Sequence, residues 1–280
     1  MELYYEGSDG SVIDFMSYPI FAQSPETLNT SQWSYTTISG VNGLGRVKRF
    51  YKDTQEANLT LSIMTDTAEE FNEVMYRIHR TFDRDIRHLK PGRLWWNGFY
   101  KEVFAVETSN DEFEELFEAV ERSVKFISVY PYWVRKRTFQ YFDQSENTGT
   151  LDYDDSVLDY DGFDYDLEEM IEVLENDCVD KANFELVFYG PCQNPSVTIG
   201  DHVYEVLTEL DQGEYAVVNS LTKKITQYDI NGDPENIFHL RSRESYIFEP
   251  IPETTATVIR DKSLKLDITI FDERGEPEWI

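Results

Sequence analysis

Cysteine and long apolar runs are both scarce in this sequence. Its 280 residues include only Cys178 and Cys192, and two thiols in a chain of this length do not make the disulfide framework of a secreted protein. Residues 1–19 contain four acidic residues, no basic residue and only short apolar runs, so neither a signal peptide nor a membrane span is expected there. We expect reduced thiols, synthesis in a cytoplasm and no membrane insertion.

Basic residues are few compared with acidic ones. The chain has 25 Lys and Arg against 54 Asp and Glu, a net charge of -29. Binding to the phosphates of nucleic acids requires clustered basic side chains, which argues against nucleic acid as a sequence-specific partner. The imbalance is largest over residues 143–180, which contain 15 acidic residues and no basic residue. The composition therefore changes near residue 138.

Size and composition predict two globular domains. A hydrophobic content of 40% with 15% aromatic residues is too high for a disordered chain. Hydrophobic cores stop growing near ~250 residues, which favours two cores in a chain of this length. The change in composition predicts an N-terminal domain of residues 1–137, a linker of residues 138–150 and a C-terminal domain of residues 151–280.

Patterns for catalysis and for metal or cofactor binding are also missing. The glycine-rich residues 40–45 lack both the spacing of a dinucleotide loop and the Lys-Ser/Thr end of a phosphate loop. Pairs of carboxylates carry no signal in a chain with this many acids. The histidines are far apart and form no pair with zinc spacing: His79, His88, His202 and His239. We predict no catalytic, cofactor-binding or metal-binding residues, and a protein that is not an enzyme.

Periodicity in the first half predicts a sheet covered by a helix. Apolar residues alternate over residues 59–63, as in a strand with one buried face. Thr67 and Glu70 form a capping box, which predicts the start of a helix. The apolar stripe of that helix is Phe71, Val74, Met75, Ile78 and Phe82.

Further elements are expected on either side of residue 110. Asn97-Gly98 lies between two apolar runs and predicts a two-residue hairpin turn. A second helical segment is expected to include Phe113, Leu116, Phe117 and Val120, followed by a strand over residues 124–127.

The last hundred residues predict short antiparallel strands. Residues 197–199 and 203–204 flank a Gly200-Asp201 turn, and residues 215–218 and 225–228 flank a polar turn. Alternating apolar residues follow at Leu264, Leu266, Ile268 and Ile270. This spacing is typical of a sandwich or barrel.

The order of several motifs resembles the distal tail proteins of bacteriophages. Residues 91–100 (PGRLWWNGFY), 124–126 (VKF) and 130–133 (YPYW) are similar to the N-terminal domain of that family. The C-terminal part resembles the family's galectin-like sandwich through residues 189–190 (YG), 194–195 (NP), 245–248 (SYIF) and 273–279 (ERGEPEW).

The resemblance implies a fold, an assembly and a set of partners. The fold would be mainly β, with an N-terminal sandwich or barrel-like α+β domain carrying one or two α-helices and a C-terminal antiparallel galectin-like β-sandwich. The N-terminal domains would form a homohexameric ring at the distal end of a virion tail. The ring would join the tail tube protein to a tail-tip fibre or lysin protein, and the C-terminal domains would dock receptor-binding or peripheral tip proteins. The resemblance implies no cofactor.

Three features keep alternatives open. The Asp-Tyr-Asp repeats at residues 152–154, 159–161 and 164–166 fit a calcium loop without its first carboxylate, a solvated acidic linker, or a docking face for a basic partner. Arg46, Lys48 and Arg49 fit one polar strand face or an inter-subunit salt bridge, and residues 37–45 are a candidate subunit contact. The C-terminal aromatics Tyr204, Tyr215, Tyr228, Tyr246 and Trp279 fit core packing or, alternatively, a carbohydrate-binding adhesion module.

Overall fold

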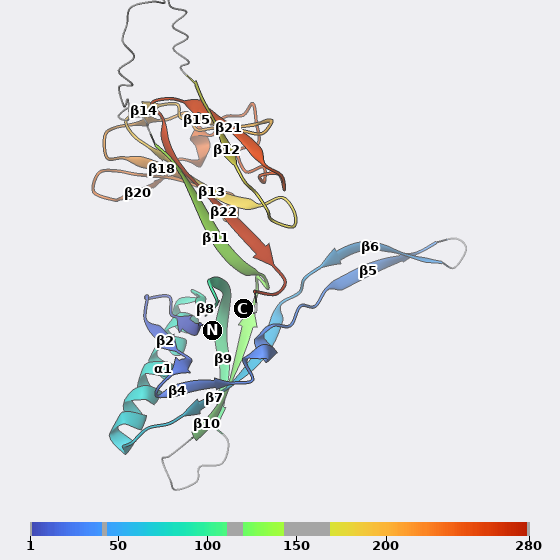
Figure 1. Ribbon diagram of the computed structural model, residues 1–280, viewed down its shortest axis with the longest axis vertical. Coiled ribbons are helices and arrows are strands. Elements are labelled where there is room, and N and C mark those ends of the chain that lie inside the picture. The colour runs from blue at the N-terminus through green and yellow to red at the C-terminus, as the bar shows by residue number, and fades with distance from the viewer. Residues whose placement is uncertain (1, 41–43, 111–119, 143–168, 279–280) are drawn as a thin grey trace, which may run out of the picture. The chain divides into compact units, whose positions relative to one another are not determined.

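The computed structural model describes residues 2–40, 44–110, 120–142 and 169–278 (Figure 1). The chain divides into two compact units. Unit 1 contains Met1–Arg135 together with Glu273–Ile280, and unit 2 contains Lys136–Asp272. Within the described ranges no helix is long and apolar enough to span a membrane. Cys178 and Cys192 are not bonded to each other.

Unit 1 is a curled antiparallel sheet with one α-helix. Its strands run in the order β3-β4-β7-β10-β9, and β9 also pairs with β8, which continues through β1 to β2. The elements are β1 (Leu3–Glu6), β2 (Val12–Asp14), β3 (Met16–Ser17), β4 (Ile20–Gln23), the 3-10 helix η1 (Pro25–Leu28), β5 (Ser34–Ser39), β6 (Gly45–Tyr51), β7 (Gln55–Ile63), α1 (Ala68–His88), β8 (Gly92–Trp96), β9 (Phe99–Asn110), β10 (Val120–Ser128) and the first part of β11 (Trp133–Tyr141).

The helix α1 begins and ends as local rules require. The Thr67 hydroxyl accepts a hydrogen bond from the Glu70 backbone N–H at 3.2 Å, and Leu89 ends the helix in the left-handed conformation with a φ of 52°. The Glu70 carboxylate bonds the backbone N–H of Asp66 instead of completing the capping box. Of the expected apolar stripe, Met75 is partly buried and the other four residues are buried in the core of unit 1.

The other local predictions for unit 1 have mixed outcomes. Asn97 and Gly98 both have positive φ angles, 45° and 81°, and form the two-residue turn between β8 and β9. The alternating strand is β7, and the strand expected over residues 124–127 lies in β10. Most of the expected second helix lies outside the described residues, but Val120 begins β10 instead of ending a helix.

Unit 2 is built from two larger antiparallel sheets that share one hydrophobic core. One has the order β20-β19-β18-β13-β22-β11 and the other β12-β21-β15-β16, and β14 pairs with β17. The elements beyond β11 are β12 (Glu169–Leu174), β13 (Asn183–Tyr189), β14 (Cys192–Gln193), β15 (Ser196–Ile199), β16 (His202–Glu205), β17 (Glu209–Leu210), β18 (Tyr215–Asn219), β19 (Lys224–Tyr228), β20 (Pro234–Asn236), the 3-10 helix η2 (Phe238–Leu240), β21 (Ala256–Asp261) and β22 (Lys265–Arg274). Together the units confirm the mainly β fold.

The strand β22 is more deeply buried than its alternation predicts. Leu266, Ile268 and Ile270 face the core, as expected. Thr269 and Phe271 on the opposite face are also buried, and both contact residues of β11, the neighbouring strand in the same sheet. The Thr138 hydroxyl lies 2.9 Å from that of Thr269, and the Lys136 ammonium lies 5.2 Å from the centre of the Phe271 ring.

The expected boundary at residue 137 and the expected linker start at 138 fall inside β11. The chain passes from unit 1 to unit 2 after Arg135 and returns after Asp272, within β11 and within β22. The change in charge composition falls within a strand because composition reports on surface residues, whereas the continuity of a strand depends on pairing. The rest of the expected linker, the Asp-Tyr-Asp repeats and Trp279 lie outside the described residues.

A buried carboxylate ties the first strand of unit 1 to α1. Asp85 is 1% exposed and accepts hydrogen bonds from the Tyr5 hydroxyl at 2.6 Å and the Ser8 backbone N–H at 2.9 Å. Burial and the bonded carboxylate raise the pKa of Tyr5. The backbone at Gly92 approaches this pair so closely that a Cβ atom there would clash with the Tyr5 ring.

We expect Asp85→Ala to lower the free energy of unfolding by about 3 kcal/mol, because two donors lose a charged acceptor in a buried site. Chemical denaturation measures the change. Asp83→Ala is the matched control, since Asp83 is exposed on the same helix and its ion pair is the exposed one with Arg87 at 3.7 Å. Its expected cost is below about 0.5 kcal/mol. Equal effects of the two variants would contradict the role assigned to Asp85.

Candidate assembly surface

Two strands of unit 1 extend away from its other elements as a hairpin arm (Figure 1). β5 and β6 pair only with each other among the described residues. All side chains of residues 35–40 and 44–50 are exposed. A two-stranded hairpin without a core is marginally stable, and its free edges can pair with another chain. The arm, residues 34–40 and 44–51, is therefore the clearest candidate for an assembly contact.

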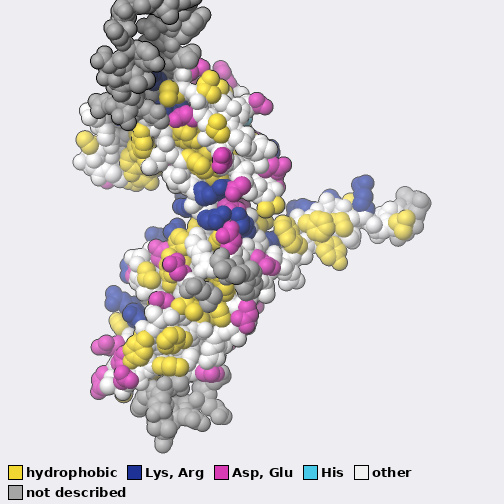
Figure 2. All heavy atoms as spheres, in the orientation of Figure 1, with side chains coloured by type: hydrophobic (Ala, Val, Ile, Leu, Met, Phe, Trp, Pro, Cys, Tyr) yellow, Lys and Arg dark blue, Asp and Glu magenta, His cyan; other side chains and the backbone are white. Residues whose placement is uncertain are grey.

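The two faces of the arm differ in chemistry. Tyr35 pairs with Phe50 across the strands, and their ring centres lie 6.3 Å apart. Lys48 is the extra residue of a β-bulge between Val47 and Arg49. Because side chains alternate along a strand, Val47 then lies on the same face as Phe50. Arg49 lies on the opposite face, with its guanidinium 4.8 Å from the centre of the Tyr51 ring. Figure 2 shows hydrophobic side chains along one side of the arm and basic ones along the other.

The charge of the arm is opposite to that of the chain. It contains Arg46, Lys48 and Arg49 and no acidic residue. None of these three side chains forms an ion pair within the described residues. Large exposed side chains lie beside them, with Tyr35 63% and Phe50 60% exposed. An acidic surface with apolar sites would complement the arm.

A lysine fixes the root of the arm. The ammonium of Lys52 lies 5.2 Å from the centre of the Trp33 ring and 4.6 Å from that of Tyr132. It also donates to the Ser31 hydroxyl at 3.3 Å and to the Pro131 carbonyl at 3.4 Å. Burial lowers the pKa of Lys52, and Glu276 opposes that shift. These contacts join the entry and exit of the arm to the body of unit 1.

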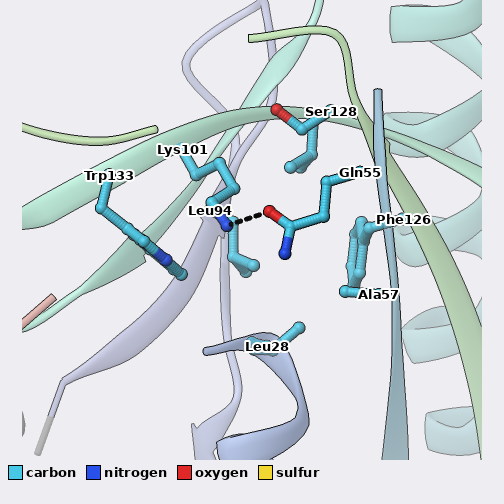
Figure 3. Close-up of a pocket in the computed structure, with 9 residues that line it drawn as sticks. Leu28, Gln55, Ala57, Leu94, Lys101, Phe126, Ser128 and Trp133 are labelled. Carbon is cyan, nitrogen blue, oxygen red and sulfur yellow. Dashed lines mark hydrogen bonds between the residues drawn. The ribbon is translucent and has the colours of Figure 1, made fainter. Parts of the chain in front are cut away.

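A second lysine, Lys101 on β9, lies inside unit 1 next to the same root (Figure 3). It donates to the Gln55 side-chain oxygen at 3.1 Å. The Gln55 nitrogen in turn donates to the Thr30 hydroxyl at 2.7 Å and to the Thr30 carbonyl. Gln55 therefore connects the segment that enters the arm, the segment that leaves it and the core of unit 1.

The Lys101 ammonium is poorly solvated. The side chain is 4% exposed, and its ammonium lies 4.7 Å from the centre of the Trp133 ring. Burial lowers the pKa of Lys101 from its usual 10.5 to about 7, with a further contribution from the charge of Lys52. The adjoining cavity has a volume of about 10 Å³, close to the minimum for one water and too small for a ligand.

Comparison with known proteins identifies the fold. No protein-family model and no curated protein matches the chain. Among solved structures, the Dit protein of phage SPP1, described as a paradigm of the hub adsorption apparatus in phages that infect Gram-positive hosts, is 10% identical, with 97% of this chain and 98% of that chain covered and a TM-score of 0.57. The chain has a Dit-type fold. The phage P2 baseplate in its activated conformation with Ca contains a chain that is 13% identical, with 99% and 100% covered and a TM-score of 0.62. The same baseplate with Sr gives the same identity and TM-score, with 99% of each chain covered.

The Dit-type fold confirms the resemblance found in the sequence, and the structure places the residues singled out there. Arg46, Lys48 and Arg49 lie on β6, and the candidate contact at residues 37–45 overlaps β5 and the tip of the arm. The histidines are not brought together: His79 bonds Arg122, His88 bonds the Arg84 carbonyl, His202 bonds the Tyr246 carbonyl and His239 is exposed. Within the described ranges no group of three potential metal ligands occurs.

The aromatic residues of unit 2 fall into three environments. Tyr204 is buried in the core and donates to the Glu249 carbonyl at 2.8 Å. Tyr215 and Tyr228 are half-buried and stack on each other at 4.7 Å. Tyr246 is 56% exposed, so core packing does not account for it.

Sequence reasoning missed Lys52, Gln55 and Lys101. The alternation of Phe99, Lys101 and Val103 could have placed Lys101 on the inward face of β9. Its acceptor lies 46 residues earlier in the chain, and no local pattern connects the two.

We expect the stability of the protein relative to Lys101→Met to depend on pH. The folded state holds the pKa of Lys101 near 7, below the unfolded value of 10.5, so the unfolded chain binds more protons between these values. The penalty for burying the charged amine is complete below pH 7 and is relieved as the pH rises. The unfolding free energy of wild type minus that of the variant should therefore increase by about 1 kcal/mol per pH unit between pH 8 and pH 10.

Urea denaturation across this range measures the difference. Lys90→Met, at an exposed lysine of the same unit, is the control and should show no such trend. A difference between wild type and Lys101→Met that stays flat from pH 7 to pH 10 would contradict the burial of a neutral amine.

Proposed function

We propose that the protein is a structural component of a phage tail tip that forms a homohexameric ring between the tail tube and the tail-tip apparatus. The observation that carries this proposal is the Dit-type fold over nearly the whole chain. The SPP1 protein of this fold is described as a hub of an adsorption apparatus, and the P2 chain comes from a baseplate. A role of this kind requires binding surfaces and no catalysis, so we propose that the protein is not an enzyme.

The arm supplies the contact between ring subunits in this proposal. A ring closes when one surface of a subunit binds a different surface of the next and the rotation returns to the start. An arm that extends from unit 1 and is exposed on both faces suits such a head-to-tail contact. Its apolar face would be buried on the neighbour, and Arg46, Lys48 and Arg49 would meet acidic groups of a chain whose net charge is -29.

The remaining partners follow from position in such an assembly. Unit 1 would bind the tail tube protein and a tail-tip fibre or lysin protein through the two rims of the ring. Unit 2 would carry docking sites for receptor-binding or peripheral tip proteins. The protein would then be located at the distal end of the virion tail after synthesis in the host bacterium.

Light scattering of the purified chain tests the ring. Six copies of 32.9 kDa give a mass of about 197 kDa. We expect the double variant Tyr35→Ser/Phe50→Ser to reduce this to the mass of one chain or of small oligomers, because the apolar face of the arm is lost. Tyr76→Ser is the matched control, since Tyr76 is 65% exposed on α1 of the same unit.

If the arm variant still forms the 197 kDa species, the arm does not provide the contact between subunits. A wild-type chain that stays monomeric at high concentration would contradict the self-assembled ring, and mixing with purified tail tube protein would then test whether assembly needs that partner.

A further inference from the structure

Unit 2 contains a second place where exposed rings lie beside cations that form no ion pair among the described residues. Three segments separated in sequence meet there, namely the turn between β18 and β19, η2, and the loop before β21. Phe238 and Phe248 are nearly parallel, with centres 6.0 Å apart, and Tyr246 meets Phe248 edge-on at 5.9 Å. Phe248 is buried, whereas Phe238 is 37% and Tyr246 56% exposed. With Lys223 and Arg241 these residues form the cation–ring cluster.

Both cations of the cluster are held by rings and backbone carbonyls. The Lys223 ammonium lies 5.5 Å from the centre of the Phe248 ring and 5.7 Å from that of Tyr246, and it donates to the Phe248 carbonyl at 3.4 Å. The Arg241 guanidinium lies 4.2 Å from the centre of the Phe238 ring and donates to the Phe238 carbonyl at 3.0 Å. Neither side chain forms an ion pair in the part of the chain that the structure describes.

The loop that carries Tyr246 is fixed by further contacts. The His202 ring is 2.9 Å from the Tyr246 carbonyl, and the Ser245 hydroxyl donates to the Val203 carbonyl at 2.5 Å. These contacts hold the backbone that carries Tyr246, so less backbone entropy is lost when a ligand binds there.

We propose that the cation–ring cluster binds an anionic sugar polymer. The free N–H groups of Arg241 can bond a phosphate or carboxylate in a fork, and Lys223 supplies a second positive charge. The exposed parts of the Phe238 and Tyr246 rings provide apolar surface for the C–H groups of a sugar ring, with the Tyr246 hydroxyl as a polar tip. Alternating sugars and anions along one chain would meet both kinds of group.

The dimensions of the cluster favour such a polymer over a docked protein. A stable protein interface buries about 800 Å² on each partner around an apolar core. Here only two rings are exposed, and the adjacent η2 residue His239 and the following Arg243 are polar and exposed. The overall charge of -29 does not prevent binding, because charges more than about 8 Å apart are largely screened at physiological salt.

Isothermal titration of the full chain with glucose-substituted poly(glycerol phosphate) tests the proposal. Dextran supplies the sugar without the charge, and inorganic polyphosphate supplies the charge without the sugar. We expect the substituted polymer to bind more tightly than either, with affinity falling as salt rises. Arg241→Ala and Phe238→Ala should each weaken binding about tenfold, and Lys265→Ala, at an exposed lysine on β22, should leave it unchanged.

Several outcomes would overturn the proposal. These are no binding of the substituted polymer, equal binding of polyphosphate with no effect of Phe238→Ala, and equal binding of dextran. Tighter binding of a synthetic Asp-rich peptide through the same residues would assign the cluster to an acidic protein. Circular dichroism of each variant establishes that unit 2 remains folded. The test does not depend on the ring, because binding per chain is measured whatever the mass of the assembly.

Discussion

The position of the arm depends on one side-chain amide. Gln55 bonds Thr30 on the way into the arm and Lys101 in the core, while it begins the strand that leaves the arm. Lys52 adds ring and carbonyl contacts beside it. A hairpin with no core of its own gains little stability from its strands alone. Its direction must therefore be set at the root, and a rigid root reduces the entropy lost when the arm binds a neighbour.

Much of this fold could be predicted from sequence where the governing interactions are local. The capping by Thr67, the apolar stripe of α1 and the Asn97-Gly98 turn each depend on residues within a few positions of one another. The exposure of both arm faces could not be predicted, because the alternation over residues 46–50 fits a half-buried strand equally well. The burial of Thr269 and Phe271 on β22 was missed for the same reason, since an alternating strand is expected to have one exposed face.

The candidate surfaces also combine features that the sequence predicts with features that depend on the fold. Arg46, Lys48 and Arg49 were recognisable as a basic strand, but the apolar face opposite them depends on the pairing of Tyr35 with Phe50. The cation–ring cluster was even harder to predict from the sequence, because Lys223, Phe238 and Tyr246 come from separate segments of the chain. Both surfaces combine exposed rings with cations that lack carboxylate partners among the described residues. In a chain with more than twice as many acids as bases, these two surfaces offer an anionic partner positive charges that form no ion pair with the described carboxylates.

The two crossings of the chain between its units have a consequence for biosynthesis. Unit 2 is an insertion between residues 135 and 273 of unit 1, and the returning segment contacts unit 1 through Glu278, which bonds Arg135, and Arg274, whose guanidinium lies 5.3 Å from the centre of the Phe99 ring. A ribosome therefore delivers all of unit 2 before the last residues of unit 1 exist. The N-terminal part of unit 1 therefore remains incomplete while unit 2 is synthesised. A fragment that ends at residue 137 would lack the returning segment of unit 1.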